Sequence, residues 1–279
     1  MNRQLRHLAP ISEAAWTEIE TEAKRTLKTM LTGRRIVDFT GPLGDDVSSI
    51  SLGRVDPIAP PTDRKVEARL RRVQPLVEFR VAFEMARSEI EAIDRGAKDP
   101  DFDPLVEAAR QISLAEDHLI FKGYPEAQVE GIFEGAHGEP FVLSDDYEAY
   151  PAAVAKAIGR LRDAGVDGPY AIVLSDRCYT GLTQTTKGGY PVIEHVRKVL
   201  GGPFFRAAAL SGALVLSMRG GDFELVVGQD LSIGYLSHDA ENVRLSIEES
   251  LTFRLLTPEA AVPLVYPKTT AGTRKPAAR

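Results

Sequence analysis

RGGDFELVVGQDLSIGY, residues 219–235, is the most informative stretch of this sequence for the fold. It opens on Gly220-Gly221, a glycine pair typical of a turn, and continues into the apolar run FELVVGQ, which predicts a strand. Two neighbouring runs also predict strands, GALVLSM at 212–218 and VRLSIEESLTFRLL at 243–256. The second run alternates over about ten or more residues, whereas the usual strand has about five or six. This part of the chain therefore predicts a set of strands, one of them unusually long.

Two long helices are predicted in the first half of the chain. The segment 12–31 has Ser12 as its N-cap, and its apolar residues recur at three- and four-residue spacing along one face. The segment 103–122 has Asp103 as its cap and Gly123 at its end, and at about 1.5 Å per residue it is roughly 30 Å long. The first helix either packs wholly on its own core or leaves part of its apolar stripe open as a docking groove.

A mixed region of helices and strands follows. Helices are predicted at 151–164 and 191–201, and YAIVLS at 170–175 predicts a strand. The segment YTGLTQTTKGGY, residues 179–190, is predicted as the loop between that strand and the second helix. Cys178 lies just after the strand and is expected to be a buried, inert cysteine.

Residues 46–74 predict a β-hairpin with one apolar face. Apolar and polar residues alternate on both sides of a proline-rich turn, beginning at Ile50 on the first side and at Val66 on the second. An isolated two-stranded ribbon is marginal in water, so its apolar face needs cover. The cover is either the chain's own domain or a neighbouring subunit, and the pattern leaves both possibilities open.

The composition is that of an ordinary globular protein, with 43% hydrophobic and 27% charged residues among 279. No apolar run of about 18 residues occurs, and the charged N-terminus lacks the apolar region of a signal peptide, so we expect a cytoplasmic protein without a membrane span. The single cysteine excludes an internal disulfide framework and a multi-thiolate metal site. A net charge of −6 argues against a general nucleic-acid binder, which needs a basic face.

Motifs of catalysis are missing from the sequence. It has neither the glycine-rich phosphate loop GxxxxGK[ST] nor the GxSxG elbow of serine hydrolases. No two of its 5 histidines lie close enough to share a helix face, so we expect no metal site. These observations favour a structural or binding protein over an enzyme.

The order of segments, with GRRIVDFTGP at 33–42 and RGGDFELVVGQDLSIGY at 219–235, resembles the family 1 encapsulins, the bacterial and archaeal nanocompartment shell proteins. The resemblance covers residues 1–266. It implies an α+β fold, that of the tailed-bacteriophage (Hong Kong 97-type) major capsid proteins, with a peripheral domain, an axial domain and an extended loop. The implied boundaries are 1–45 for the N-terminal helix and arm of the peripheral domain, 46–74 for the extended hairpin, 75–130 for the peripheral domain with its spine helix, 131–225 for the axial domain with the pore loop, 226–266 for peripheral strands and 267–279 for a disordered basic tail.

The resemblance also implies the function. Chains of this class close into sixty-subunit icosahedral shells of T=1 symmetry, in which the hairpin lies across a neighbouring subunit. The shell encloses a cargo enzyme that carries a short, largely apolar C-terminal targeting peptide, and it admits small molecules through pores. The expected cargo is a dye-decolorising peroxidase or, second, a ferritin-like protein, which suggests a role in oxidative stress or iron storage.

Site residues follow from positions that match the family. The cargo peptide is expected to dock between the N-terminal helix and the peripheral domain, on Leu27, Leu31, Arg34, Ile36, Asp38, Ile233 and Tyr235. The loop CYTGLTQTTKGGYP matches the fivefold pore loop, and the pore is expected to be lined by Thr185, Thr186, Lys187, Gly188 and Gly189. Five copies of the lysine would form a cationic ring that favours small anions.

One family feature is absent from this sequence. Some members hold a flavin against an exposed tryptophan near the start of MARSEIEAIDRG, residues 85–96. Ser88 stands at that position here, and the only tryptophan is Trp16. Tyr190 matches the flavin-proximal area but offers a smaller stacking surface, so we expect no cofactor in the shell.

Two other functions remain open at this point. A prophage-type capsid protein that packages DNA would share the fold, although the acidic chain and the absence of a basic inner arm argue against it. A bacteriocin or protease activity is the third possibility, and it lacks a visible nucleophile–base pair.

Overall fold

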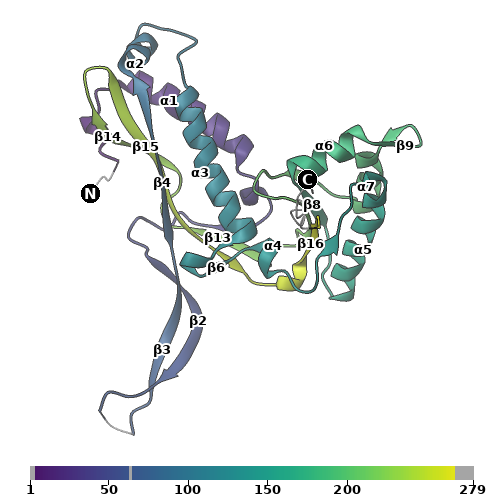
Figure 1. The fold of residues 1–279 in the computed structure, drawn as a ribbon. Coiled ribbons are helices and arrows are strands. Elements are labelled where there is room, and N and C mark those ends of the chain that lie inside the picture. The colour runs from purple at the N-terminus through teal and green to yellow at the C-terminus, as the bar shows by residue number, and fades with distance from the viewer. Residues whose placement is uncertain (1–3, 63–64, 268–279) are drawn as a thin grey trace, which may run out of the picture. The chain divides into compact units, whose positions relative to one another are not determined.

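The computed structural model describes residues 4–62 and 65–267, so the basic tail predicted at 267–279 lies outside the described residues from 268 onward. The described residues form two compact units, one within 1–135 and 220–258 and the other within 136–219 and 259–267. Both units combine helices with strands, which gives an α+β fold (Figure 1). Among the described helices, none has the length and apolarity that crossing a bilayer requires.

The sheet of the first unit is built around one long strand, β15 (Asn242–Leu255). On one side β15 pairs along most of its length with β4 (Val77–Ala86), and on the other side with β14 (Ser232–His238) and then β13 (Phe223–Val227). A short strand, β1 (Asp38–Thr40), pairs in parallel with β13. The order β1-β13-β15-β14 leaves β14 at an edge of the sheet. The long strand predicted at 243–256 is confirmed.

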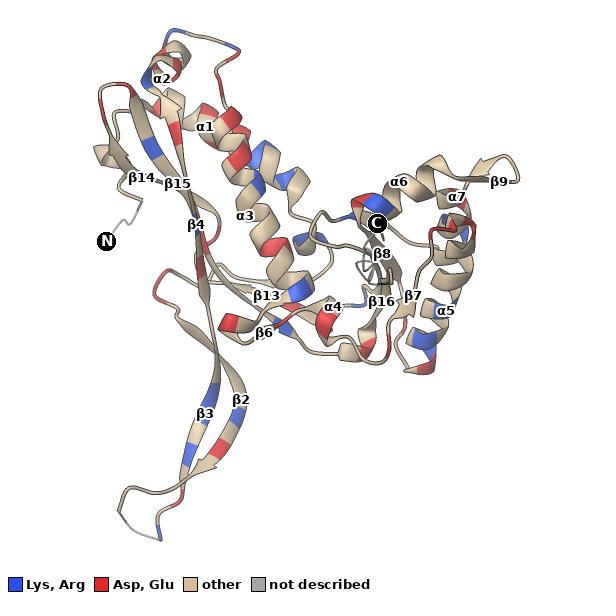
Figure 2. Ribbon diagram, viewed as in Figure 1, with Lys and Arg blue, Asp and Glu red and all other residues tan. Residues whose placement is uncertain are grey.

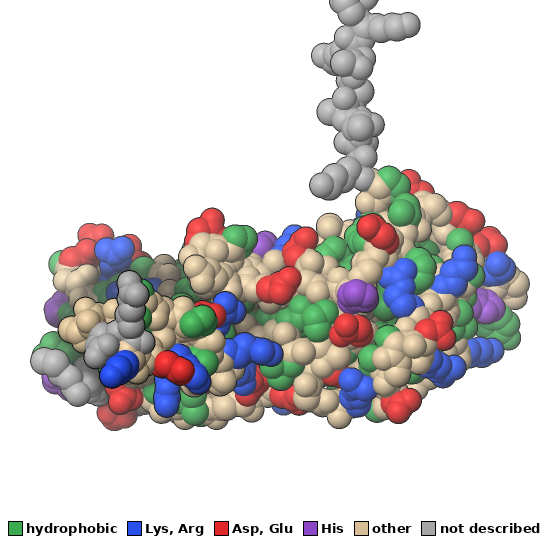
Figure 3. Space-filling model, turned by 90° about the horizontal axis from the view of Figure 1, so that it is seen from below, with side chains coloured by type: hydrophobic (Ala, Val, Ile, Leu, Met, Phe, Trp, Pro, Cys, Tyr) green, Lys and Arg blue, Asp and Glu red, His purple; other side chains and the backbone are tan. Residues whose placement is uncertain are grey.

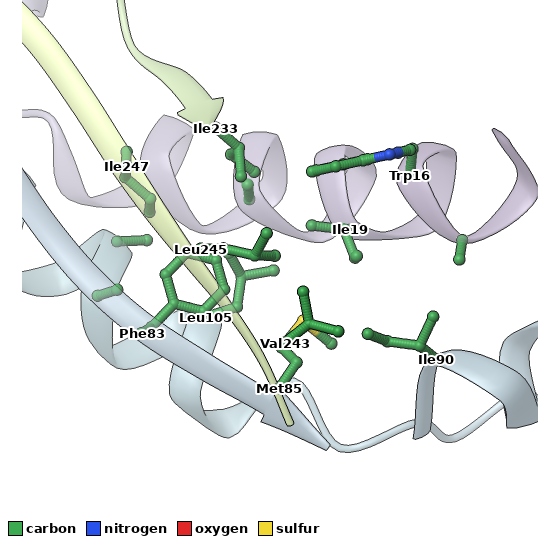
Figure 4. Close-up of a cluster of buried hydrophobic side chains, with 14 of the residues drawn as sticks. Trp16, Ile19, Phe83, Met85, Ile90, Leu105, Ile233, Val243, Leu245 and Ile247 are labelled. Atoms are coloured by element: carbon green, nitrogen blue, oxygen red, sulfur yellow. The ribbon is translucent and has the colours of Figure 1, made fainter. Parts of the chain in front are cut away.

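Helices α1 (Glu13–Met30), α2 (Arg87–Asp94) and α3 (Asp103–Lys122) supply the other side of this unit's core. The buried cluster in Figure 4 joins Trp16 and Ile19 of α1 to side chains of the sheet and the other helices. Ser12 caps α1 by accepting a hydrogen bond from the Ala15 N–H at 3.1 Å, as the sequence predicts. The smaller elements are η1 (Arg6–Leu8), η2 (Gly33–Arg35), β5 (Gly123–Tyr124), η3 (Pro125–Ala127), β6 (Val129–Glu130) and α4 (Ile132–Gly135).

The predicted cap of α3 is wrong in one detail. Phe102 occupies the N-cap and makes no side-chain cap, while Asp103 is the first helical residue. The Asp103 N–H is satisfied instead by the carboxylate of Asp101, two residues earlier, at 2.9 Å. Gly123 ends the helix as predicted, with a φ of 82° that favours glycine.

The predicted hairpin is confirmed, as β2 (Ser49–Ile58) and β3 (Ala68–Pro75), which among the described strands pair only with each other. This pair, called the arm below, has apolar residues on both faces. In the observed register Leu70 lies opposite Asp56, and Val55 lies opposite Arg71, so that Leu70 and Val55 face opposite sides. The prediction of a single apolar face is therefore wrong.

Charged side chains of both signs lie along the arm (Figure 2). Among them, Arg72 pairs with Asp56 at 2.6 Å. The view from below shows charged and apolar side chains interspersed over the visible face (Figure 3). The arm thus has a mixed surface, on which large apolar residues are about half exposed: Val55, Ile58, Leu70 and Val73.

The second unit has its own five-stranded sheet. Its order is β11 (Phe204–Arg206), β8 (Tyr170–Leu174), β12 (Ala213–Ser217), β16 (Ala261–Val265) and β7 (Phe141–Val142). Two of its interior strands, β8 and β12, are buried along their whole length, which explains their continuous apolar sequences. The remaining elements are η4 (Tyr147–Ala149), α5 (Tyr150–Asp163), α6 (Asp176–Gln184), β9 (Thr186–Lys187), β10 (Tyr190–Pro191), α7 (Val192–Leu200) and η5 (Pro258–Ala260).

Two features of this unit differ from the sequence-based expectations. The segment 179–190 is not all loop, because α6 continues to Gln184, capped by Ser175 and anchored by the buried side chains of Cys178 and Leu182. The final strand, β16, pairs with β12 and so belongs to this unit, although the family resemblance implies peripheral strands over the whole of 226–266. Cys178 is buried, as predicted.

Candidate functional site

A groove of about 320 Å³ lies in the first unit between helix α1 and the edge strand β14. One wall is a single face of α1, formed by Glu20, Ala23, Lys24 and Leu27. Residues spaced by three, four and seven positions lie on the same side of a helix. The other wall is β14, with Ile247 of β15 beside it. The lining residues are Gln4, Arg6, Glu20, Ala23, Lys24, Leu27, Leu231, Ser232, Ile233 and Ile247.

The apolar part of the groove continues the core of the unit. Ile233 and Ile247 belong to the buried cluster on which α1 packs, and Figure 4 shows both beside that helix. Ala23 is buried and small, whereas Leu27 is only partly buried and packs against the edge of the same cluster. The groove is therefore an opening onto the core, and its apolar wall suits the aliphatic side chains of an extended segment.

The polar end of the groove is an ion network around Glu20. Arg6 forms an ion pair with Glu20, and Lys24 Nζ lies 3.4 Å from the same carboxylate. The hydrogen bond from Arg6 lowers the pKa of Glu20 below its usual value. The guanidinium of Arg6 also lies 4.7 Å from the ring centroid of Trp16 and donates to the Ile233 carbonyl oxygen at 2.9 Å.

Of the seven predicted docking residues, Leu27 and Ile233 line this groove. Tyr235 lies further along β14, half-buried, and its hydroxyl is hydrogen-bonded to Nδ1 of His238 at 2.5 Å. Leu31 and Ile36 are buried, and they pack within the fold rather than lining the groove.

Arg34 is the centre of a largely buried cluster of charges. Its Nη2 contacts Glu116 at 2.7 Å and Glu249 at 3.1 Å, and its Nη1 contacts Asp230 at 2.7 Å. Burial acts to lower the pKa of Arg34, but the hydrogen bonds and charges of Glu116 and Asp230 outweigh it and raise the pKa. Burial, together with the neighbouring Glu116, raises the pKa of Glu249 well above its usual value. The cluster ties η2 to α3, to β15 and to the segment before β14.

Asp38, the first residue of β1, contacts the turn that precedes β13. Its Oδ2 accepts a hydrogen bond from the Gly221 N–H at 2.6 Å, and so it fixes the glycine turn that precedes β13. Asp117 does the same for the turn after α1, since it accepts from the Gly33 N–H at 2.7 Å and the Thr32 N–H at 3.3 Å. Burial raises the pKa of Asp117 to about 7.

Sequence reasoning missed most of the groove's polar lining. Glu20, Ala23 and Lys24 share a helix face with Leu27, so helical spacing was a usable signal for them. Arg6 gave no such signal, because it reaches the groove only through the path of the chain before α1.

The five predicted pore residues are brought together in the second unit, at a small hairpin formed by β9 and β10. Gly188 and Gly189 form its turn with φ angles of 61° and 84°, which a residue with a Cβ seldom adopts. Lys187 is exposed, and its Nζ lies 3.5 Å from Oε2 of Glu148. The charge carried by this hairpin is therefore partly balanced by a neighbouring carboxylate.

The two positions relevant to a flavin lie in different units. Ser88 is exposed on α2, and Tyr190 is exposed on β10.

Within the described ranges 4–62 and 65–267, no three His, Cys, Asp or Glu side chains are grouped in a way that could hold a metal ion.

Comparison with solved structures defines the class of the fold. The chain superposes on a virus-like particle protein from Pyrococcus furiosus with a TM-score of 0.63, at 15% identity, over 88% of this chain and 98% of the other. It superposes on a chain of Gordonia phage Cozz with a TM-score of 0.54, at 10% identity, over 85% of this chain and 86% of the other. The fold is thus that of the HK97-like phage capsid proteins, as the sequence predicts.

Comparison of sequences defines the family within that class. Residues 1–252 match the family described as "Encapsulating protein for peroxidase". The chain is 51% identical to the type 1 encapsulin shell protein of Rhodospirillum rubrum over 270 residues, which cover 95% of this chain and 96% of the relative. The chain belongs to the type 1 encapsulin shell proteins, a family of structural, non-enzymatic proteins.

Proposed function

We propose that this chain is the subunit of a closed icosahedral shell of T=1 symmetry with 60 copies, located in the cytoplasm. The observation that carries the proposal is the arm, because its large apolar residues are about half exposed on both faces and no other strand in the described part of the chain pairs with it. A ribbon of this kind gains stability when other copies cover it. Arms that are given to one neighbour and received from another make heterologous contacts, which close into rings around a symmetry axis.

The groove between α1 and β14 is the proposed docking site for cargo. Its apolar wall fits a short, largely apolar peptide at the C-terminus of an enzyme, and Leu27 and Ile233 would contact that peptide directly. Leu31, Arg34, Ile36, Asp38 and Tyr235 would act by holding the two walls in place. Many such sites in one cavity raise occupancy even when each binds weakly. A dye-decolorising peroxidase is the first cargo that we propose, and a ferritin-like protein is the second.

A loading experiment tests the docking site. A fluorescent protein that ends in a flexible linker and a short apolar peptide is coexpressed with the shell, and its fluorescence is measured in the purified particles. Leu27→Asp places a charge in the apolar wall, so we expect loading to fall about tenfold while particles still form. Arg25→Asp is the matched control, because Arg25 is exposed on another face of α1 and contacts Glu22. Equal loading of all three shells would refute the docking site.

The hairpin of β9 and β10 is the proposed rim of a pore at the fivefold axes, with Thr185, Thr186, Lys187, Gly188 and Gly189 around the opening. Its exposure and its glycine turn support the proposal, since they allow several copies to approach one another closely. We also propose that the shell binds no flavin, because Ser88 offers no aromatic surface for stacking. A purified shell that releases a flavin on denaturation would contradict that part of the proposal.

A further inference from the structure

Two carboxyl groups meet in the core of the first unit with one guanidinium between them. The side chains of Glu116 on α3 and Glu249 on β15 are 0% exposed, and Arg34 of the turn η2 contacts both of them. Asp230, a third acidic neighbour, keeps 41% of its side chain exposed, so water surrounds part of its carboxylate. Two fully buried negative charges beside one positive charge would leave a net charge in the core, which costs free energy.

The two buried carboxyl groups are not equivalent. Glu116 receives three hydrogen bonds from Arg34, at 2.7 to 2.9 Å, whereas Glu249 receives one, at 3.1 Å on its Oε2. Oε1 of Glu249 is buried, and no group in the described part of the chain donates to it. An ionised oxygen in that position loses its hydration without compensation, whereas a protonated oxygen needs only an acceptor.

The strand β4 brings no charge to Glu249. Opposite Glu249 this strand carries Phe79, and the charged residues on either side of it, Glu78 and Arg80, lie on the other face of the sheet because successive side chains alternate. Arg80 pairs there with Glu248 at 2.8 Å. The charges that act on Glu249 therefore come from the opposite side of the sheet.

On that side the balance of charges favours a neutral Glu249. Burial raises the pKa of Glu249 well above its usual value, Glu116 and Asp230 raise it further, and Arg34 opposes them. Asp117, next to Glu116 on α3, faces the turn η2 and holds a separate proton, since burial raises its pKa to about 7.

We propose that Glu249 and Glu116 share one proton, carried on Oε1 of Glu249 and donated to the carboxylate of Glu116, and that this proton holds the turn η2 closed against α3 and β15. With the proton in place, the core contains one guanidinium, one carboxylate and one neutral carboxyl. When the turn opens, Glu249 meets water and releases the proton, so opening becomes easier as the pH rises. The turn is therefore held most firmly in mild acid and is loosened toward alkaline pH.

Infrared difference spectroscopy of the purified full-length protein detects the proton. A protonated carboxyl group has a C=O stretch apart from the bands of ionised carboxylates. The wild-type spectrum minus that of Glu249→Gln at pH 6 should contain this band, because glutamine keeps a neutral side chain with one donor and one acceptor in place. Glu248→Gln is the matched control on the other face of β15, and it should remove only an ionised carboxylate.

Loss of ionised carboxylate bands alone in Glu249→Gln would overturn the proposal. A second variant keeps the test valid if Glu249→Gln does not fold. Asp117→Asn retains both glutamates and lacks the other raised carboxyl group, so it must still show the band of a protonated carboxyl at pH 6. Absence of the band from that variant would likewise overturn the proposal.

Hydrogen exchange tests whether the proton holds the turn. The N–H groups of Arg35, Ile36 and Val37 donate within the turn, so their exchange reports its opening. The ratio of their exchange rates in the wild type and in Glu249→Gln should rise about tenfold between pH 5.5 and pH 6.5, because opening releases one proton. Glu248→Gln should exchange as the wild type does. A ratio that stays constant with pH would refute the role of the proton in closing the turn.

Discussion

Arg34 and Glu116 form a buried, multiply hydrogen-bonded ion pair that joins the segment after α1 to helix α3. Both Nε and Nη2 of Arg34 contact the carboxylate, at 2.7 to 2.9 Å, and the side chain of Glu116 has 0% exposure. Glu249, equally buried, and Asp230 complete the surroundings of the guanidinium. Arg34 therefore contacts three acidic side chains, and its removal would leave the buried Glu116 without its guanidinium partner.

Arg34→Ala is expected to destabilise the subunit by about 3–5 kcal/mol, because it leaves Glu116 buried without its guanidinium partner. The measurement is guanidinium unfolding of the variant beside Arg25→Ala, whose ion pair with Glu22 is exposed and should contribute little to stability. If Arg34 served only to contact cargo, the two variants would unfold alike and only the loading of cargo would differ.

Asp117 is expected to make stability depend on pH. Its pKa is raised from 3.8 to about 7 by burial, so the folded chain binds this proton more tightly than the unfolded chain does. Its contribution is therefore fully present below pH of about 4 and is lost as the pH rises toward 7. Relative to Asp117→Asn, the wild type should lose about 2–3 kcal/mol between pH 5 and pH 8.

Denaturant unfolding of both proteins at the two pH values measures this difference. Both retain the neighbouring Glu116 and Glu249, so the pH dependence of those groups is largely common to the pair. A stability difference between wild type and variant that is the same at both pH values would show that Asp117 is ionised in the folded chain throughout.

The arm is expected to control assembly without controlling the fold of the subunit. Leu70 is 58% exposed and Val73 is 53% exposed, on opposite faces of the arm, so a charge at either position disturbs few contacts within the chain. Leu70→Glu and Val73→Glu should each prevent shell formation, with the circular dichroism of the subunit little changed. Glu67→Gln, at an exposed position just before β3 where Glu67 pairs with Arg69, is the control that should still assemble.

The charge of the proposed pore depends on two residues that face each other in one subunit, Lys187 and Glu148. Lys187→Glu should reverse the preference for small anions over cations, and Glu148→Gln should increase the preference for anions about threefold. The measurement is the rate at which small charged probes reach a reporter enzyme inside loaded shells. Rates that neither variant changes would place this hairpin away from the route of entry.

Local pattern predicted most of the elements. The spacing of apolar residues predicted α1 and α3 almost to the residue, and alternation predicted β15. The prediction of a loop over 179–190 was wrong, because α6 continues to Gln184. Cys178 and Leu182 are one helical turn apart and both are buried. Two apolar residues indicate a helix too weakly to outweigh the glycine and threonine residues around them.

Features that depend on pairing across the chain could not be predicted in this way. The two-faced arm follows from the register of β2 with β3, which alternation alone does not give. Arg34 lies 82 residues from Glu116 and 215 from Glu249, and no spacing rule connects such distant positions. The resemblance to encapsulins pointed to the region between α1 and β14, but the polar end of the groove, with Arg6 and Glu20, emerged only from the structure.

Direct observation of the purified protein is the decisive measurement for the account as a whole. The chain is expressed alone and examined at micromolar concentration and neutral pH by negative-stain electron microscopy and by sedimentation velocity. The exposed apolar residues of the arm predict uniform hollow particles, with little material sedimenting as a single chain. A well-folded monomer under these conditions would contradict the claim that copies of this chain complete one another.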